Sequence, residues 1–258
     1  MNLKRLSIAF AFLTLFLYGG LIGSLFYFYR GPLFLEALFS DRTLFSIRLS
    51  LATATIATII SVAVAVPSAY ALSRFDFPGK RFIDTLLEFP MIVSPAALGA
   101  MILIFFSTPL GEVLQERTVQ FVFAFAGIVL AQFVTTAGVA TRLLKAALDE
   151  TPRRYEEVAR SLGASPFQAF FTITLPLAKR GIIASVILTW AKALGEFGAT
   201  ITVAGSMAMK TETLPIAIFM RLSGADIEGS AVLILILVSI GFAILYGTRF
   251  LTEKTPHA

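Results

Sequence analysis

Long apolar stretches separated by short polar segments dominate the pattern along this chain. A transmembrane α-helix needs about 20 predominantly apolar residues to cross about 30 Å of hydrocarbon. Six stretches reach that length, and they cover residues 6–28, 45–72, 83–106, 119–141, 182–203 and 231–251. The pattern therefore predicts an all-α integral membrane protein with six transmembrane helices, forming a single domain over residues 1–258.

The first apolar stretch follows Lys4 and Arg5. It is longer than the apolar region of a signal peptide, which covers about 7–15 residues. We therefore expect an uncleaved transmembrane helix that ends at the membrane interface, where aromatic side chains are enriched. Tyr27, Phe28 and Tyr29 supply those side chains.

Three prolines interrupt the apolar stretches. Pro67 is expected to interrupt the second span, and Pro90 and Pro95 are expected to bend or break the third. Both hinges and static kinks fit this pattern, and static kinks are favoured because a kink at proline needs no functional explanation. Segments 108–118 and 205–230 are predicted to be loops.

Residues 151–181 form the one long segment with the pattern of structured polar surface. In its first half, Thr151 is a candidate N-cap, Pro152 fits the first helical position, and Gly163 fits a left-handed C-terminal residue. The spacing predicts a helix between Pro152 and Gly163. An apolar stripe at i, i+3, i+4 and i+7 runs along this helix and contains Tyr155, Val158, Ala159 and Leu162.

The second half of this segment begins a new helix immediately. Ser165, Pro166 and Gln168 have the spacing of a capping box with proline at the first helical position. Pro176 disfavours helical structure in the residue before it, so the second helix is predicted to end there. The segment is thus a predicted helix–glycine–helix element between two membrane spans. An ordinary amphipathic loop at the membrane surface has the same local features.

Composition and charge agree with a membrane location. Of the 258 residues, 57% are hydrophobic and 14% are charged, and the mean hydropathy is +0.85, whereas soluble domains contain about 25% charged residues. If six spans begin in the cytoplasm, fourteen of the twenty-one basic residues lie in or beside the cytoplasmic segments. That asymmetry follows the positive-inside rule and places both termini and segment 142–181 in the cytoplasm.

The spacing within the helix–glycine–helix element is more specific. Glu157-x-Ala159-x-x-x-Gly163, nine residues and then Ile173-x-Leu175-Pro176 resembles the EAA loop of ABC-importer membrane subunits, with Val158 as the one departure. In that family the loop is a coupling helix that docks on a cytoplasmic ATPase subunit. The resemblance implies an ATPase-coupling role for Glu156, Glu157, Val158, Ala159, Gly163, Ala164, Ile173, Leu175 and Pro176.

The fifth span contains two ionisable residues, Lys192 and Glu196, four positions apart. Charged residues inside a membrane are costly and usually face the bundle interior or a wet cavity. Two readings stay open. The charges either pair, with each other or with a neighbouring helix, and fix helix packing, or they line a translocation pathway together with Thr200, with Lys192 attracting an anion. Beside them, Ala191, Gly195 and Ala199 recur every four residues and predict a small-residue packing face.

A narrower resemblance joins several parts of the chain. Segments 193–200, 204–205 and 213–218, together with the turn at 77–80, are similar to permeases of molybdate, tungstate and sulfate importers, with Ser206 departing from the expected Asn. This implies the binding-protein-dependent ABC importer permease (MetI-like) fold in a cell (inner) membrane. It also implies a homodimer, two cytoplasmic ATPase subunits and an external binding protein that delivers the oxyanion. Molybdate or tungstate is expected, with sulfate or thiosulfate as the alternative.

Other classes fit less well. The spans contain no Cys, no His and no conspicuous acidic pair, and His257 lies near the end of the chain, so a membrane enzyme or a metal site is disfavoured. No phosphate-binding loop motif occurs, so ATP and Mg²⁺ are expected in the partner ATPase and no cofactor in this chain. A channel or an ion-driven carrier stays open, but would leave the EAA-like loop unused. Spans on both sides of residues 151–175 argue against nucleic-acid binding.

Overall fold

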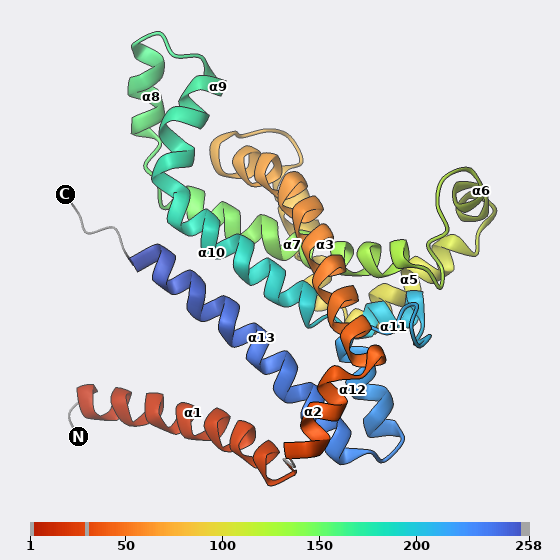
Figure 1. Ribbon diagram of the computed structural model, residues 1–258. Coiled ribbons are helices and arrows are strands. Elements are labelled where there is room, and N and C mark those ends of the chain that lie inside the picture. Colours follow the sequence, from red (N-terminus) through yellow and green to blue (C-terminus); the bar gives the residue numbers. More distant parts are fainter. Residues whose placement is uncertain (1–2, 29–30, 254–258) are drawn as a thin grey trace.

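The computed structural model describes residues 3–28 and 31–253, and within these ranges every regular element is helical (Figure 1). The helices long enough to span a membrane, alone or with their extensions, are α1 (Leu3–Leu25), α3 (Asp41–Arg74), α7 (Phe125–Asp149), α10 (Leu175–Leu194) and α13 (Ile227–Glu253). The shorter elements are η1 (Phe26–Phe28), α2 (Gly31–Phe39), α4 (Lys80–Ile92), α5 (Pro95–Phe106), α6 (Pro109–Arg117), α8 (Arg154–Ser161), α9 (Pro166–Ala169), η2 (Phe170–Thr174), α11 (Gly198–Ala204) and α12 (Leu214–Ser223).

Helices α3 and α7 pack against each other and form the centre of the fold, with α10 against both. Small side chains allow this close approach: Ala65 and Ala69 of α3 meet Ala140 of α7 in a cluster of buried residues. Between the same helices the hydroxyls of Ser61 and Thr136 lie 2.9 Å apart in a buried hydrogen bond. The central helices therefore associate through close packing of small residues and through hydrogen bonds. This is expected in a membrane, because lipid tails are as apolar as the helices and no hydrophobic force drives the helices together.

The third predicted span is broken. Helices α4 and α5 meet at an angle of 108° across Val93 and Ser94, which confirms the predicted break. The break lies just before Pro95, the first residue of α5, whereas Pro90 lies inside α4. The Ser94 hydroxyl accepts a hydrogen bond from the backbone N–H of Ala97 at 3.3 Å, so the new helix starts with its own cap.

The second span is longer than predicted and continuous. Helix α3 extends over 34 residues with Pro67 inside it, so the prediction that Pro67 interrupts this span was wrong. A proline within a transmembrane helix is tolerated where neighbouring helices and polar side chains compensate for the lost bond. Here α7 and α10 pack along α3.

The fifth span differs from its prediction at both ends. The apolar helical stretch covers residues 166–194 instead of 182–203, because the chain passes from α9 through the π-helical turn η2 into α10. Pro176 lies in the first turn of α10, where a backbone N–H is not needed for a hydrogen bond within α10. It therefore does not end a helix. The span ends at Leu194, and α11 is a separate short helix.

Two predicted loops contain helices. Segment 108–118 contains α6, capped by Thr108, and segment 205–230 contains α12. The fourth span begins at Phe125 and extends to Asp149, later at both ends than predicted. The sixth span, α13, contains the whole predicted range 231–251 and begins four residues earlier.

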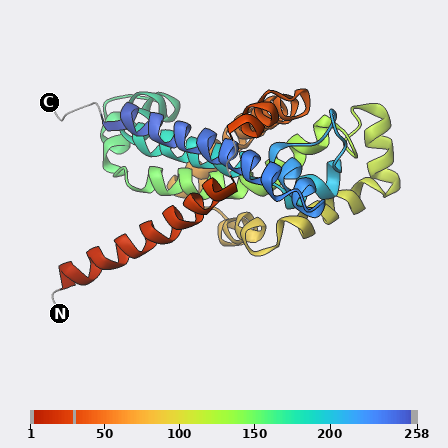
Figure 2. The ribbon, with the colours of Figure 1, turned by 60° about the horizontal axis from the view of Figure 1, so that its bottom comes forward.

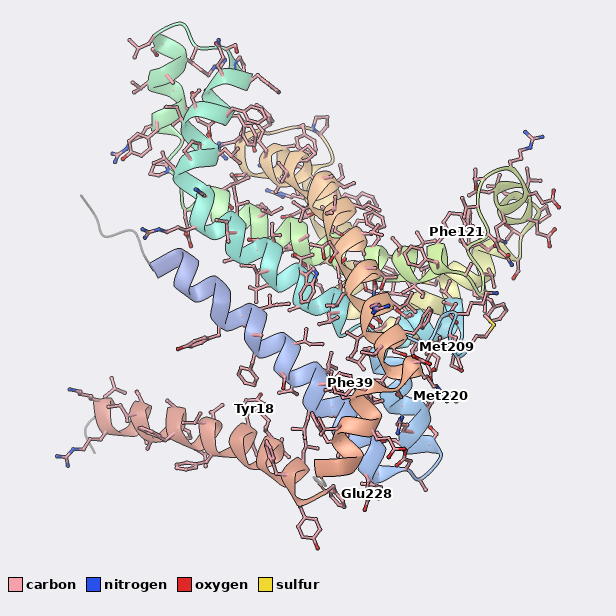
Figure 3. The ribbon with its side chains drawn as sticks, viewed as in Figure 1. Tyr18, Phe39, Phe121, Met209, Met220 and Glu228 are labelled. Carbon is pink, nitrogen blue, oxygen red and sulfur yellow. The ribbon has the colours of Figure 1, made fainter. Side chains whose placement is uncertain are left out.

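Helix α1 stands apart from most of the molecule, as both ribbon views show (Figures 1 and 2). None of its residues is buried. The predicted aromatic group at its end includes Tyr29, which lies outside the described residues. The pair α8–α9 projects at one end of the molecule. Phe121 and Met209 lie far from that pair, near the end of α11 (Figure 3).

Candidate functional site

Helix α8 begins later than the sequence predicted. Its first residue is Arg154, preceded by Arg153 in a helical conformation without a side-chain cap, so neither Thr151 nor Pro152 takes the predicted position. Thr151 is buried, and its carbonyl accepts a hydrogen bond from Nη2 of Arg74 at 3.0 Å. Thr151, which local capping rules assigned to the start of the helix, instead makes a tertiary contact with Arg74.

The turn after α8 confirms the predicted role of Gly163. This glycine has φ = +94°, and its N–H donates to the carbonyl of Arg160 at 3.0 Å. The N–H of Ala164 donates to the carbonyl of Ala159, also at 3.0 Å. These two bonds form a complete Schellman motif, which ends the helix and reverses the chain with most of its polar groups satisfied.

The start of α9 confirms the predicted capping box. The Ser165 hydroxyl accepts from the N–H of Gln168 at 3.2 Å, and the Gln168 carbonyl oxygen accepts from the N–H of Ser165 at 2.8 Å. Together with the Schellman motif, the capping box fixes the angle between α8 and α9. The projecting pair is therefore a defined unit.

A buried carboxylate anchors this unit to the membrane helices. Glu156 is only 8% exposed, and its Oε1 accepts from Nε of Arg74 at 2.7 Å and from the hydroxyl of Thr174 at 2.6 Å. Its Oε2 accepts from the hydroxyl of Tyr70 at 3.0 Å. Nη2 of Arg74 also donates to the carbonyl of Leu148 at 3.0 Å. One ion pair thus joins the ends of α3 and α7 to α8 and η2.

The electrostatics of Glu156 follow from these contacts. Burial by itself raises the pKa of this carboxyl group, but the hydrogen bonds from Thr174, Arg74 and Tyr70 and the charge of Arg74 outweigh it. The pKa of Glu156 therefore lies below its ordinary value of 4.5. The ion pair is fully formed at neutral pH.

The predicted apolar stripe of α8 faces outward. Tyr155, Val158 and Leu162 are exposed, Leu162 to 84%, and Phe167 of the adjoining helix α9 is 73% exposed. Contiguous exposed apolar side chains of this kind mark interaction surfaces. We call Tyr155, Val158, Leu162 and Phe167 the outer face of the helix pair.

The remaining residues of the EAA-like pattern divide between surface and interior. Glu157 and Pro176 are exposed, whereas Ala159, Ala164, Ile173 and Leu175 are partly buried. The two adjacent acids therefore differ: Glu157 points to solvent and Glu156 points into the fold. Sequence periodicity gave no reason to expect the acid, instead of the apolar stripe, to be buried.

The polar residues of the fifth span do not lie on one helical face. Because α10 ends at Leu194, Gly195 is its C-cap and Ala199 belongs to α11, so the predicted four-residue packing face was wrong. Glu196 is 4% exposed, and its Oε1 accepts from the N–H of Ala199 at 3.0 Å. Lys192 is exposed, and among the described residues no ion pair joins it to Glu196. The proposed pairing of these two charges is therefore not formed.

The break after α10 packs against the break between α4 and α5. A Cβ added to Gly198 would lie 3.0 Å from the backbone nitrogen of Ala96, and one added to Gly99 would lie 2.8 Å from Cα of Ala199. Close backbone contact of this kind requires glycine. Thr200 is fully buried in this region, and its hydroxyl has no hydrogen-bond partner within the described part of the chain.

The sequence alone does not reveal the three partners of Glu156, namely Arg74, Tyr70 and Thr174. Glu156 lies 82 positions after Arg74 in the chain. A single sequence carries no pattern that links positions so far apart.

The helical architecture, the broken helix pair and the projecting unit define the class as a multi-pass membrane transport protein. The chain belongs to the family of binding-protein-dependent transport system inner membrane components, whose family model matches residues 57–255. It is an ABC-importer permease of the oxyanion group.

The similar proteins fall in two groups. The molybdenum transport system permease ModB of Escherichia coli K12 is 34% identical over 203 residues, which cover 78% of this chain and 88% of that protein. The sulfate permease CysT of the same strain is 28% identical over 221 residues, 85% of this chain and 80% of that protein. Among solved structures, a bacterial ABC transporter involved in alginate import matches with a TM-score of 0.78 over 98% of both chains at 17% identity, which supports the fold.

Proposed function

We propose that this chain is the membrane subunit of an ATP-driven importer that carries an oxyanion, molybdate or tungstate, into the cell. Two copies form the translocation unit, two ATPase subunits bind it in the cytoplasm, and an external binding protein delivers the anion. ATP and Mg²⁺ act in the ATPase subunits, and this chain catalyses no reaction. The cluster of basic residues near segments 73–82 and 142–181 supports a cytoplasmic location for α8, α9 and both termini.

The observation that carries this proposal is the construction of the α8–α9 unit. Its outer face presents exposed apolar side chains, among them Leu162 and Phe167. The Schellman motif at Gly163 and the capping box at Ser165 fix its shape. A rigid, amphipathic projection allows a membrane protein to bind a soluble ATPase subunit and to follow its conformational change. The EAA-like residues from Glu157 to Pro176 lie on this unit, on η2 or in the first turn of α10.

The proposed pathway passes the end of α10. Lys192 is exposed although it lies in an apolar span, and a lysine in contact with lipid tails is costly. In the dimer it is expected to face a wet pathway, where its charge attracts an oxyanion. Glu196 and Thr200 lie further along the same segment, and Glu196 uses its carboxylate to hold the start of α11. Closure of the ATPase dimer draws the two α8 helices together and opens the pathway outward.

The substrate assignment rests on similarity. The identity to the molybdenum permease of Escherichia coli is 34%, compared with 28% for the sulfate permease of that strain. We therefore propose molybdate or tungstate ahead of sulfate. Sulfate is the second candidate because its permeases match over a comparable share of the chain.

The decisive experiment is ATP-dependent uptake of labelled tungstate into proteoliposomes that contain this subunit, its ATPase and its binding protein. Competition by molybdate and not by sulfate is the expected result. Competition by sulfate assigns the chain to the sulfate branch. An intact complex that hydrolyses ATP and imports no oxyanion contradicts the proposed substrate class.

The pathway is tested with Lys192→Ala in the same assay. We expect tungstate uptake to fall at least about tenfold, since a hydrogen bond between charged groups contributes about 1.5–3 kcal/mol and about 1.4 kcal/mol corresponds to a factor of ten. Lys192→Arg should retain most uptake. Lys210→Ala, which removes an exposed lysine from the segment before α12, is the matched control. Normal uptake by Lys192→Ala would show that this charge is outside the pathway.

A further inference from the structure

Of the two adjacent acids in α8, only Glu157 faces outward to a partner. Glu156 instead points toward the membrane helices and is held there by Arg74, Tyr70 and Thr174. The side chain of Arg74 is itself only 5% exposed. The ion pair is therefore an internal contact of this chain, and the ATPase would not touch it.

The ion pair bridges segments that the backbone joins only indirectly. Helix α8 packs chiefly against α9 and η2, which precede α10. The covalent route from α8 to α10 passes through the Gly163 turn and the π-helical turn η2. The Gly163 turn holds α8 and α9 at a fixed angle, whereas η2 interrupts the regular α-helical hydrogen bonding, so a displacement of the α8–α9 unit can be absorbed at η2.

Arg74 also joins α8 to the ends of two other spans. While Nε binds Glu156, Nη2 donates to the carbonyls of Leu148 at the end of α7 and Thr151 beyond it, each at 3.0 Å. Nη1 donates to the hydroxyl of Ser73 at 3.0 Å. Only the planar guanidinium offers donors in these several directions at once, and a lysine ammonium cannot reproduce the arrangement.

We propose that Arg74 and Glu156 are positioning residues that transmit the movement of the coupling helix α8 to α3 and α7. This inference rests on the proposed function, because it presupposes that an ATPase moves α8. When α8 moves, the ion pair moves the C-terminal end of α3 with it, and the bonds from Arg74 carry the end of α7 along. Helix α3 contains 34 residues and is therefore about 50 Å long. Through its packing on α7, the displacement reaches the opposite side of the membrane.

The outer end of α3 has a comparable fixed connection. Arg42 binds Glu212, which is 1% exposed at its side chain, through two bonds of 2.7 and 2.6 Å. The N–H of Leu214, the first residue of α12, donates to the hydroxyl of Ser50 at 2.7 Å. A shift of α3 would therefore also move the segment before α12. The helix is attached at both ends, as a transmitting element must be.

The test measures ATP hydrolysed per tungstate imported in the complete transporter. We expect Arg74→Lys to raise this ratio at least about fivefold while the ATPase still binds with wild-type affinity. Arg81→Lys is the matched control: it makes the same exchange at an exposed arginine in the first turn of α4, and is expected to leave the ratio unchanged. A role of Arg74 in folding alone would lower the yield of transporter without changing the ratio of the assembled molecules.

A milder variant protects the test against loss of folding. Tyr70→Phe removes a single hydrogen bond to Glu156 and keeps the ring that packs on Phe170, with ring centroids 4.8 Å apart. We expect a smaller rise in the ratio, about twofold. Wild-type ratios in both Arg74→Lys and Tyr70→Phe would overturn the inference. A wild-type complex that imports no oxyanion contradicts the proposed function instead, and this result is obtained before any variant is made.

Discussion

The turn at Gly163 offers the most direct perturbation of the α8–α9 unit. Its φ of +94° lies in the region that L-residues rarely adopt, and no heavy atom lies within 4 Å of a Cβ built on it. The cost of Gly163→Ala is therefore purely conformational, about 1–2 kcal/mol. Gly163→Val costs more because a β-branched residue at positive φ is a strong outlier. Gly163→Asn should cost least, since asparagine tolerates left-handed backbone.

The consequence can be measured as affinity for the ATPase subunit. If a strained turn rearranges, docking must restore the wild-type conformation, so about 1–2 kcal/mol becomes about a 5–30-fold weaker binding constant. The assay is a titration of purified ATPase onto the permease in lipid nanodiscs, with ATP hydrolysed per tungstate imported as the second readout. Wild-type affinity and stoichiometry for Gly163→Val would refute the need for a left-handed turn. A loss for Asn as large as that for Ala would refute the conformational explanation.

Two further predictions concern packing and pH. Gly138→Ala places a Cβ 2.2 Å from the carbonyl oxygen of Leu87, so we expect about 1–3 kcal/mol of destabilisation when unfolding is measured in detergent. Gly241→Ala is the control, because nothing lies within 4 Å of its added Cβ, and it should be neutral or slightly stabilising. Equal effects of the two substitutions would contradict the close contact of α4 with α7. Because folding lowers the pKa of Glu156, its contribution to stability is complete above the ordinary value of 4.5 and is lost as pH falls through the lower folded pKa. The melting temperature of the wild-type protein should therefore fall as the pH drops below 4.5, and that of Glu156→Gln should fall less steeply. Parallel plots of melting temperature against pH for the wild type and the variant would show that another group is responsible.

The sequence by itself determined the features that depend on local chemistry or on composition. Apolar stretches of about 20 residues predict membrane spans, and these spans are helical because backbone groups cannot remain unpaired in lipid. The capping box at Ser165 and the left-handed Gly163 were predictable because their partners lie within five residues. The break before Pro95 was predictable for the same reason, since proline restricts the residue that precedes it.

The tertiary structure decided which side of each element is buried and where the fifth span ends. Sequence periodicity identified the apolar stripe that contains Leu162 but gave no sign that Glu156 is buried, since its charge is stabilised by a guanidinium 82 positions earlier. The span ends at Leu194, where the Glu196 carboxylate takes up the N–H of Ala199 and α5 packs against α11. Both outcomes depend on contacts between segments far apart in the chain, whose energies no local pattern of residues contains.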